Sequence, residues 1–436
     1  MLLVVIPPMQ SPDESDHLMR AYLFGQGQLV LEAPSGRATG GEIDTGLAQY
    51  IEVYSPLFWN PQRKLSAIEV EAAKKIDWTN ETIFRPLPGM AYYFPAIYFV
   101  HASALRLGQS MGLSVATSYY LAKGMLLVTI CAVLSFAFYL YAPSFLTLAL
   151  LAIPMTIFQI SSASLDGIVT ALCVLLISVF LRVSQDKSSS RQSLFFVALG
   201  VWFLLAASRV QLFALIILLI MMPIWMRKIR YQWFTLVVAT LVVVWQVFVL
   251  RSTVDGRVQL GETPLNIIIY YLQHIDELTS VIWRTLLDPT TARGTFSSFL
   301  GVLGWIDAPF TGSEYKHLTI LIGLLALLCI NFDLLRQTWR TSVLLLLVSL
   351  TVTAIIYAAL LVTWTPHPAS VINGIHGRYF LIPALLCVYA VSESVVSMAR
   401  WRKVFGAVLL STLALYSATN TTKLLLDRYY LQSQQP

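Results

Sequence analysis

The stretch TSVLLLLVSLTVTAIIYAALLVT, residues 341–363, holds no charged side chain over its whole length. A helix needs about 20 apolar residues to cross the hydrocarbon core of a bilayer, and this stretch meets that length. Comparable apolar runs recur from Tyr119 to Thr422, which is more apolar length than a soluble core can bury. The sequence therefore predicts an all-α polytopic membrane protein.

The composition of the 436-residue chain supports this prediction. Hydrophobic residues make up 57% of the chain and charged residues only 12%, against about 25% charged in a soluble domain. The formal net charge is +6, but Lys and Arg lie in short patches between apolar runs rather than in one stripe. Membrane topology explains such patches better than nucleic acid binding does.

Polar loops divide the chain into five parts. Residues 1–8 form an apolar stub, a truncated or partial first membrane helix, and residues 9–118 form a first extracytoplasmic loop. Transmembrane helices follow in 119–250, a second extracytoplasmic loop in 251–317, and further helices with an extracytoplasmic tail in 318–436. We expect about 10–11 transmembrane helices, with spans near 119–141, 144–160, 165–182, 194–208, 210–226, 232–250, 318–335, 341–363, 379–398 and 404–420.

The positions of the basic residues predict the orientation of these helices. The positive-inside rule places Lys- and Arg-rich short loops in the cytoplasm. The loops concerned carry Arg182/Lys187/Arg191, Arg227/Lys228/Arg230, Arg336/Arg340 and Arg400/Arg402/Lys403. Counting spans back from them puts loop 9–87 outside, so the apolar segment 88–107 does not cross the membrane. We expect 88–107 and the amphipathic stretch 265–287 to be interfacial helices.

The first candidate for chemistry is SPDESDH, residues 11–17. If a helix begins at Pro12, one face carries, at helical spacing, Asp13, Asp16, His17 and Arg20. Carboxylates beside an imidazole can take a proton from a hydroxyl group. The alternative is structural, because Ser11 and Glu14 also have the spacing of a helix capping box.

Further candidates lie at the outer ends of the predicted spans. Asp166 is a second acid or a metal ligand that shares a pocket with Asp13, or an acid that caps a helix after Ser164. Three cations, Lys123, Arg209 and Arg378, suit a phosphate group held at the membrane surface. The alternatives are that Lys123 snorkels to the interface and that Arg209 ends a short helix.

The motif GIHGRYF, residues 374–380, opens a later span. Its glycines permit close backbone approach, and Arg378 with Tyr379 could grip a phosphate and a sugar ring. Anchoring at the membrane interface by Trp364 and Tyr379 is the alternative. The chain has no P-loop, no GxGxxG and no HExxH motif.

Five motifs together resemble a family of bacterial membrane proteins known only as a domain of unknown function. They are PMQSPDESDHLMRA (8–21), QISSASLD (159–166), SRVQ (208–211), GVLGWID (301–307) and GIHGRYF (374–380). That family is similar to the GT-C superfamily of glycosyltransferases, which includes protein O-mannosyltransferases, the aminoarabinose transferase of lipid A and phage glucosyltransferases that modify O-antigen.

The resemblance implies a GT-C-like fold and a transferase in the bacterial inner membrane. Such an enzyme moves a sugar from a polyprenyl-phosphate donor to a surface glycan or lipid acceptor, for example in O-antigen modification of lipopolysaccharide, at an extracytoplasmic site. The catalytic carboxylate carries over to Asp13 or Glu14, and the second acid to Asp166. The resemblance leads us to expect Arg at position 123, so Lys123 departs from it, while the phosphate role of Lys123, Arg209 and Arg378 follows from their charge and position. The expected substrate pocket holds His17, Arg20, Gln211, Trp305, Asp307, His376 and Tyr379.

The mechanism expected from this arrangement is a single displacement that inverts the anomeric carbon. Asp13 takes the acceptor proton while the lipid phosphate leaves, and the reaction does not require a metal, although a divalent metal is compatible with it. Apart from the metal-ligand alternative for Asp166, we assign no metal site, and we expect no nucleic acid partner. Two alternatives stay open: an O-antigen polymerase or ligase, and a transporter or flippase of lipid-linked sugars.

Overall fold

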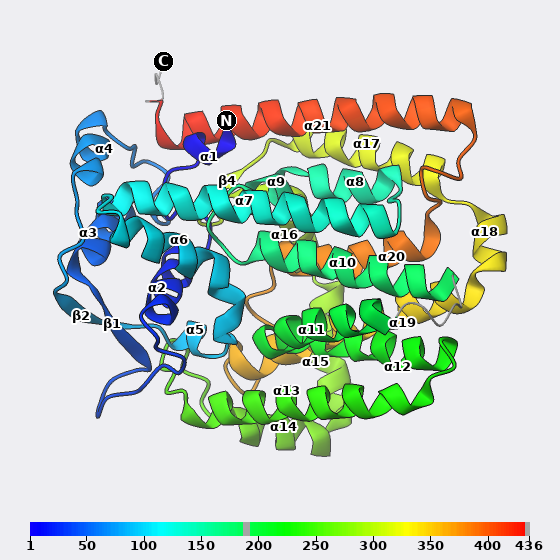
Figure 1. The fold of residues 1–436 in the computed structure, drawn as a ribbon, viewed down its shortest axis with the longest axis horizontal. Helices are drawn as coiled ribbons and strands as arrows, with labels where there is room; N and C mark the ends of the chain where they lie inside the picture. The colour runs from blue at the N-terminus through cyan, green and yellow to red at the C-terminus, as the bar shows by residue number, and fades with distance from the viewer. Residues whose placement is uncertain (186–191, 432–436) are drawn as a thin grey trace.

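The computed structural model describes residues 1–185 and 192–431 and is built almost entirely of helices (Figure 1). Two of the basic residues expected in the first cytoplasmic loop, Lys187 and Arg191, lie outside the described residues. Within the described part, six helical segments are long and apolar enough to cross a membrane. They are α7 (Val115–Leu140), α10 (Asp166–Gln185), η5 with α13 (Ile229–Ser252), α17 (Gly312–Cys329), α19 (Trp339–Thr363) and α21 (Arg400–Tyr429). The prediction of an all-α polytopic membrane protein is confirmed.

The remaining expected spans are shorter or broken in the structure. Three apolar segments of 10–17 residues are α11 (Gln192–Ser208), η4 with α12 (Val210–Leu215 and Ile216–Trp225), and η6 with α20 (Gly377–Phe380 and Leu381–Val391). The expected span 144–160 forms two helices, α8 (Phe145–Ala152) and α9 (Pro154–Ile160). Proline at position 154 lacks the N–H group that would continue α8, so the helix ends before it.

Two predicted boundaries also differ. The span expected at 318–335 begins earlier, because Thr311 and Glu314 form a capping box at the start of α17. That helix ends at Cys329, and a separate short helix, α18 (Phe332–Gln337), follows it. The span expected at 379–398 ends as a helix at Val391.

The first long loop folds into short helices and one pair of strands, which are separated in the sequence by α3, η1 and α4. Strands β1 (Gly40–Asp44) and β2 (Thr82–Pro86) pair antiparallel, with Gly40 opposite Pro86 and Asp44 opposite Thr82. The segment 88–107 lies in short helices, and none of them is among the described helices long enough to span a membrane. The N-terminal stub holds α1 (Leu2–Val5). The helices of the first loop are α2 (Glu14–Gly25), α3 (Thr45–Tyr54), η1 (Ser55–Leu57), α4 (Ala67–Lys74), α5 (Pro88–Ala91), η2 (Pro95–Tyr98) and α6 (Phe99–Ser110).

The second long loop contains three helices and a small strand pair. The stretch 265–287, expected as one helix, is two helices that meet at His274: α14 (Pro264–Gln273) and α15 (Ile275–Leu287). A third helix, α16 (Pro289–Gly301), is too polar to be detected as an apolar run. Strands β3 (Val302–Leu303) and β4 (Ala308–Pro309) follow it and pair with each other.

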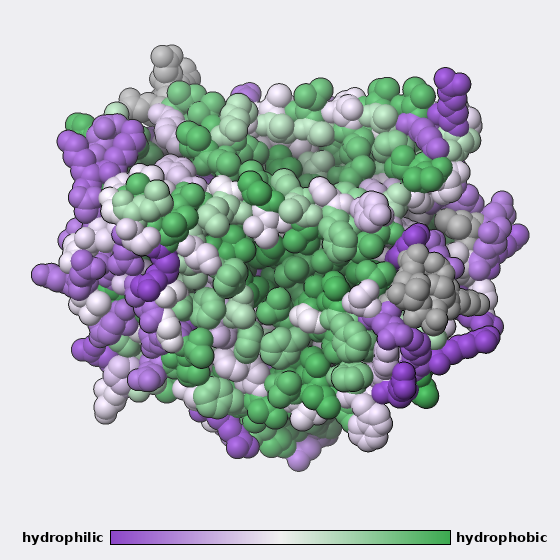
Figure 2. All heavy atoms as spheres, viewed as in Figure 1, coloured by the Kyte–Doolittle hydropathy of each residue, from purple (hydrophilic) through white to green (hydrophobic). Residues whose placement is uncertain are grey.

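The long helices lie roughly side by side along the longest axis of the molecule (Figure 1). Figure 2 shows hydrophobic side chains gathered over the middle of this face, across α7, α10, α11 and α13, with hydrophilic side chains gathered at both ends. The hydrophilic end at the left of the view carries α3, α4, β1 and β2 of the first loop. An apolar band between polar ends is the surface that a bilayer requires.

Candidate functional site

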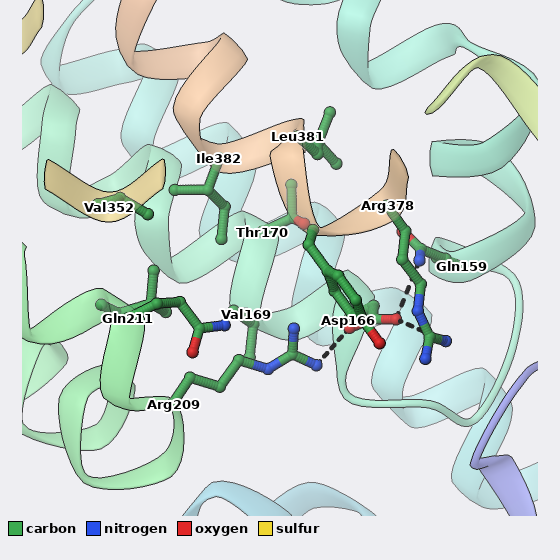
Figure 3. Close-up of a pocket in the computed structure, with 12 residues that line it drawn as sticks. Gln159, Asp166, Val169, Thr170, Arg209, Gln211, Val352, Arg378, Leu381 and Ile382 are labelled. Atoms are coloured by element: carbon green, nitrogen blue, oxygen red, sulfur yellow. Dashed lines mark hydrogen bonds and ion pairs between the residues drawn. The ribbon is translucent and has the colours of Figure 1, made fainter. Parts of the chain in front are cut away.

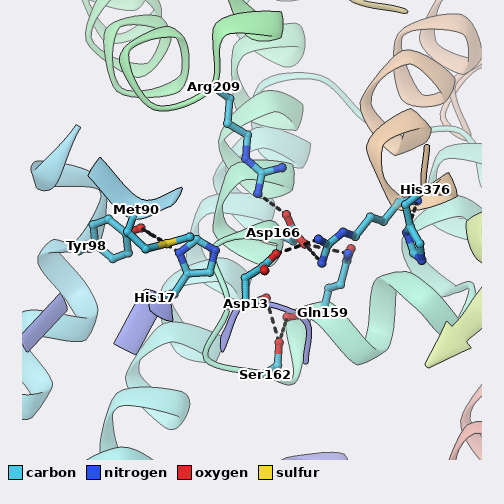
Figure 4. Close-up of polar contacts among 11 residues, drawn as sticks. Asp13, His17, Met90, Tyr98, Gln159, Ser162, Asp166, Arg209 and His376 are labelled. Carbon is cyan, nitrogen blue, oxygen red and sulfur yellow. Dashed lines mark hydrogen bonds and ion pairs between the residues drawn. The ribbon is translucent and has the colours of Figure 1, made fainter. Parts of the chain in front are cut away.

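An ion cluster, formed by Asp13, Asp166, Arg209 and Arg378, lies where four segments that are far apart in the sequence meet (Figure 4). They are the loop before α2, the first turn of α10, the junction between α11 and η4, and η6. An Arg378 Nη2 atom lies 2.9 Å from Asp13 Oδ2, and Arg378 Nη1 lies 3.6 Å from Asp166 Oδ2. Arg209 forms an ion pair with the other oxygen of Asp166. Two guanidinium groups and two carboxylates therefore meet at one point, as the motifs predict.

Asp166 lies at the centre of this cluster. It is the first residue of α10, where the helix dipole favours a negative charge. Gln159 Nε2 donates a hydrogen bond to Asp166 Oδ2 at 2.9 Å, so the carboxylate has partners on three sides. The Ser164 hydroxyl instead pairs with the Ser162 hydroxyl at 3.0 Å. Asp166 is thus both an acid at a helix start and the group that orients both arginines. Gln159 was not among the predicted site residues, although its motif was.

The two arginines line a small cavity (Figure 3). Its volume is about 10 Å³, which is room for roughly one water molecule. The predicted residues Gln211 and Tyr379 also line it. Both guanidinium groups are largely buried, and the Nε atoms of Arg209 and Arg378 have no hydrogen-bond partner in the described structure. Both Nε atoms are buried beside a cavity that holds about one water molecule, so an anion can accept from them only after the side chains around the cavity move apart.

Asp13 and Glu14 have different environments. Helix α2 begins at Glu14 rather than Pro12, because Asp13 has a left-handed backbone with φ 63°. The Glu14 side chain is fully buried: Oε1 accepts hydrogen bonds from Tyr119 Oη at 2.8 Å and from Ala163 N at 2.6 Å, and Oε2 accepts from Ser11 N at 3.1 Å. Only this half of the expected capping box forms, since the Ser11 hydroxyl has no hydrogen-bond partner among the described residues. The Asp13 side chain is 44% exposed and is the carboxylate that an acceptor can reach.

The other residues expected on one face of α2 hold different partners. His17 Nδ1 lies 2.8 Å from Tyr98 Oη, and burial lowers the pKa of His17 to about 3, so the ring is neutral. Arg20 donates to the carbonyl oxygens of Gln28 at 2.9 Å and Leu29 at 2.7 Å, which fastens the chain after α2. Burial and the nearby Asp13 charge raise the pKa of Asp16 to about 6. The helix start predicted at Pro12 is therefore wrong, and Asp13 lies outside α2, while Asp16, His17 and Arg20 keep their helical spacing within it.

Three predicted site residues lie in other contacts. Lys123 Nζ donates to the carbonyl oxygens of Leu3 at 3.0 Å and Ile6 at 3.2 Å, so its charge stabilises the end of α1 instead of joining the arginines. Asp307 Oδ2 accepts from Arg428 Nη2 at 2.6 Å, a partner that no sequence motif indicated. The third residue is Trp305, whose Nε1 donates to the Met9 carbonyl at 2.8 Å.

The GIHGRYF motif presents Arg378 through a close helix contact. A Cβ atom at Gly377 would lie 2.1 Å from Phe299 N and 2.2 Å from Thr295 O, so only glycine lets η6 approach α16 this closely. His376 Nδ1 accepts from Arg378 N at 3.3 Å. Burial and the adjacent Arg378 charge lower the pKa of His376 to about 3, so this ring is also neutral.

The chemistry available to the cluster follows from these contacts. Asp13 is an accessible carboxylate that can accept a proton, and the two arginines are buried donors that can hold an anion beside it. Among the described residues, no group of three or more His, Cys, Asp or Glu side chains is placed to hold a metal ion.

Comparison with known proteins identifies a family. The family described as a predicted membrane protein (DUF2142) matches residues 1–388, and the chain belongs to it. No curated protein and no solved structure matches the chain.

Proposed function

We propose that this DUF2142 membrane protein is a glycosyltransferase of GT-C type. It moves a sugar from a polyprenyl-phosphate donor to a hydroxyl group of a glycan or lipid acceptor on the extracytoplasmic side of the bacterial inner membrane. The observation that carries the proposal is the half-exposed Asp13 carboxylate 2.9 Å from the buried Arg378, with Arg209 held next to it by Asp166.

The donor is a phosphodiester with one negative charge, and the two guanidinium groups can donate to it once the side chains around the water-sized cavity move apart. The two carboxylates balance the two arginines, and His17 and His376 are neutral, so these six side chains together carry no net charge. Binding one monoanion in such a site is favourable when charge-assisted hydrogen bonds replace its water. In the reaction, Arg209 and Arg378 stabilise the second negative charge that develops on the leaving phosphate.

The reaction balances with the residues present. The acceptor oxygen attacks the anomeric carbon and forms the new glycosidic bond while the bond from that carbon to the phosphate oxygen breaks. Asp13 takes the hydroxyl proton and becomes a neutral carboxylic acid, and polyprenyl phosphate leaves with the bonding electrons. Attack opposite the leaving group inverts the configuration at the anomeric carbon.

Replacing Asp13 with Asn tests the proposal directly. The amide has the shape of the carboxylate but cannot take the proton, so we expect transfer to fall about 10²–10⁴-fold. Transfer is measured in vesicles from cells with and without the gene, by the radiolabelled sugar that leaves the polyprenyl phosphate. Thermal unfolding of the purified Asp13→Asn variant should match that of the natural protein. Full retained transfer would overturn the assignment.

Glu14→Gln is the matched control for this experiment. Its carboxylate is buried and accepts three hydrogen bonds, two of them from main-chain N–H groups. A neutral amide in this position turns one acceptor into a donor and loses charge-assisted bonds, so the free energy of unfolding should fall by about 1–3 kcal/mol. The two variants therefore separate a group used in the reaction from one used in the fold.

A transporter or flippase of the same lipid is the alternative class. In that case Asp13→Asn should abolish the translocation of a fluorescent polyprenyl-phosphate sugar in proteoliposomes. The proposed enzyme should show no Asp13-dependent translocation in that assay.

A further inference from the structure

Three aromatic side chains from two distant loops form a surface that we call the aromatic platform: Phe58, Trp59 and Trp305. The Trp305 ring lies between the others, with its centroid 4.4 Å from Phe58 and 4.7 Å from Trp59. The Trp59 residue is 68% exposed. An indole this exposed in a preformed cluster is available to a ligand.

A single buried arginine at the end of α21 holds both loops in place. Arg428 Nη2 donates to the Leu57 carbonyl at 2.7 Å and Nη1 to the Arg63 carbonyl at 3.1 Å. The same guanidinium group is paired with Asp307, two residues after Trp305, at 2.6 Å. The platform is therefore rigid before any ligand arrives, and such preorganisation favours binding.

Both loops are strained where they present apolar side chains. Trp59 has φ 50° and Ile306 has φ 64°, a region that L-residues rarely adopt and that is most unfavourable for β-branched side chains. Ile306 is 50% exposed, so packing does not explain why it occupies this conformation. Strained backbone of this kind is typical of binding and catalytic sites.

The platform is joined to the Asp13 loop. The Trp305 indole donates to the Met9 carbonyl, four residues before Asp13, and Gln10 Nε2 donates to the Tyr54 carbonyl at 3.3 Å, just before the Phe58 loop. Met9 and Asp13 have positive φ angles of 64° and 63°. Residues 9–13, with positive φ angles at both ends, thus connect the aromatic platform to the ion cluster.

We propose that the aromatic platform binds a sugar ring of the acceptor glycan. This rests on the proposed function, because the donor sugar is bonded to the phosphate and lies at the arginines, which leaves the platform for the acceptor. A pyranose ring has an apolar C–H face that stacks on indole and a rim of hydroxyl groups. The exposed polar side chains beside Trp59, namely Asn60, Gln62 and Arg63, match that rim and do not suit the hydrocarbon region of a bilayer.

The test uses the full chain in lipid nanodiscs on an array of bacterial surface polysaccharides. We expect the natural protein to bind one or more of them and Trp59→Ala to bind the same glycan about tenfold more weakly, which corresponds to about 1.4 kcal/mol. Trp283→Ala is the matched control. Trp283 lies in α15, outside the platform, and its exposed fraction of 63% is similar to the 68% of Trp59. Absence of glycan binding by the natural protein, or equal binding by Trp59→Ala, would overturn the proposal.

A second measurement decides whether Trp59 is a membrane anchor instead. Nanodiscs made with brominated phosphatidylcholine quench only those indoles that touch the lipid chains. Trp59→Phe removes the fluorescence of one indole. We expect this loss in the part of the tryptophan emission that brominated lipid does not quench. If it comes from the quenched fraction, Trp59 lies in lipid and the carbohydrate site is wrong.

Failure of this inference differs from failure of the proposed function. Asp13→Asn should lose sugar transfer but bind the glycan as the natural protein does. If the natural protein binds the glycan but transfers no sugar, the glycosyltransferase proposal is wrong and the glycan-binding role of the aromatic platform still stands. If the protein transfers sugar and Trp59→Ala leaves the KM for the acceptor unchanged, the glycan-binding role of the platform is wrong and the proposed enzyme activity still stands.

Discussion

Asp13 and Glu14 are neighbours in the chain, and the backbone between them decides what each can do. The left-handed conformation of Asp13 turns its side chain out of the α2 helix toward Arg378, while Glu14 enters the helix and is buried against Tyr119. Two adjacent acids are indistinguishable by composition. Their different environments follow from the backbone conformation of Asp13. A loss of activity in a variant of either acid therefore needs a measurement of stability beside it, to separate a role in the reaction from a role in the fold.

The strain at Ile306 makes a prediction at the scale of one residue. Glycine adopts φ 64° without steric conflict, so Ile306→Gly should raise the free energy of unfolding by about 1 kcal/mol. The measurement is thermal unfolding of the purified protein in detergent.

The control for this prediction is Ile68→Gly. Ile68 is also exposed, but it lies in helix α4, where glycine should lower the free energy of unfolding by about 1 kcal/mol. If both variants were destabilised equally, the backbone at Ile306 would not be strained.

Sequence reasoning at this scale identified the ion cluster but not all of its residues. Asp13, Asp166, Arg209 and Arg378 meet as the motifs suggested. Lys123 was indistinguishable from them in the sequence, because an ammonium group beside an apolar run can bind a phosphate or carbonyl oxygens equally well. Lys123 instead donates to carbonyl oxygens at the end of α1. This contact depends on how residues 1–8 pack against α7, which cannot be predicted from residue types.

At the scale of elements, the contact between η6 and α16 positions the phosphate-binding arginine. Gly377→Ala would place a methyl group within 2.2 Å of the α16 backbone, so η6 must move away and Arg378 with it. We expect the free energy of unfolding to fall by about 1–3 kcal/mol and transfer to fall more than tenfold. Both are measured on the same preparation.

Gly200→Ala is the control for the η6 contact. Gly200 lies in α11, and a Cβ atom there would have no atom within 4 Å among the described residues, apart from its chain neighbours and the nearby backbone of α11. Alanine in a helix should be neutral or slightly stabilising and should leave transfer unchanged. A loss of activity in both variants would show that the effect is not specific to the η6 contact.

The sequence predicted long apolar helices such as α19 well and the short elements poorly. Hydropathy integrates over about 20 residues, so it detects 341–363 but passes over the break that Pro154 makes between α8 and α9. Helix α16 is polar enough to be taken for loop, although it forms the support of η6. Elements that position a site are short and mixed in polarity, and periodicity is weakest there.

At the scale of the whole molecule, the few charged residues fall into two groups: one predicts the orientation of the helices, and the other forms the ion cluster. Eleven of the 29 Lys and Arg residues lie in the four short loops between helices that the positive-inside rule places in the cytoplasm. The ion cluster is formed by segments expected on the opposite side. The side of the membrane stays a prediction, and cysteine labelling of an exposed position in each set of loops would test it.

The buried titratable groups near the cluster predict how the stability of the whole molecule depends on pH. Burial lowers the pKa of His17 and His376 to about 3 and of His101 to about 4, against 6.5 for an ordinary histidine. Between about pH 6.5 and 4 the unfolded chain therefore binds protons at these three residues that the folded chain does not. Their contribution to the free energy of unfolding falls as the pH falls through this range.

Asp16 acts in the opposite direction. Its pKa is raised from 3.8 to about 6, so between those values the folded chain holds a proton that the unfolded chain has lost, and stability from this group decreases as pH rises. One acid opposes three histidines, so the midpoint of thermal unfolding should fall on acidification from pH 7 to 5. Asp16→Asn should be more stable than the natural protein above pH 6, with the difference vanishing below about pH 4. A midpoint that rises between pH 7 and 5 would mean that these histidines are not buried as neutral rings, and the neutral charge balance on which anion binding at Arg209 and Arg378 depends would then be wrong.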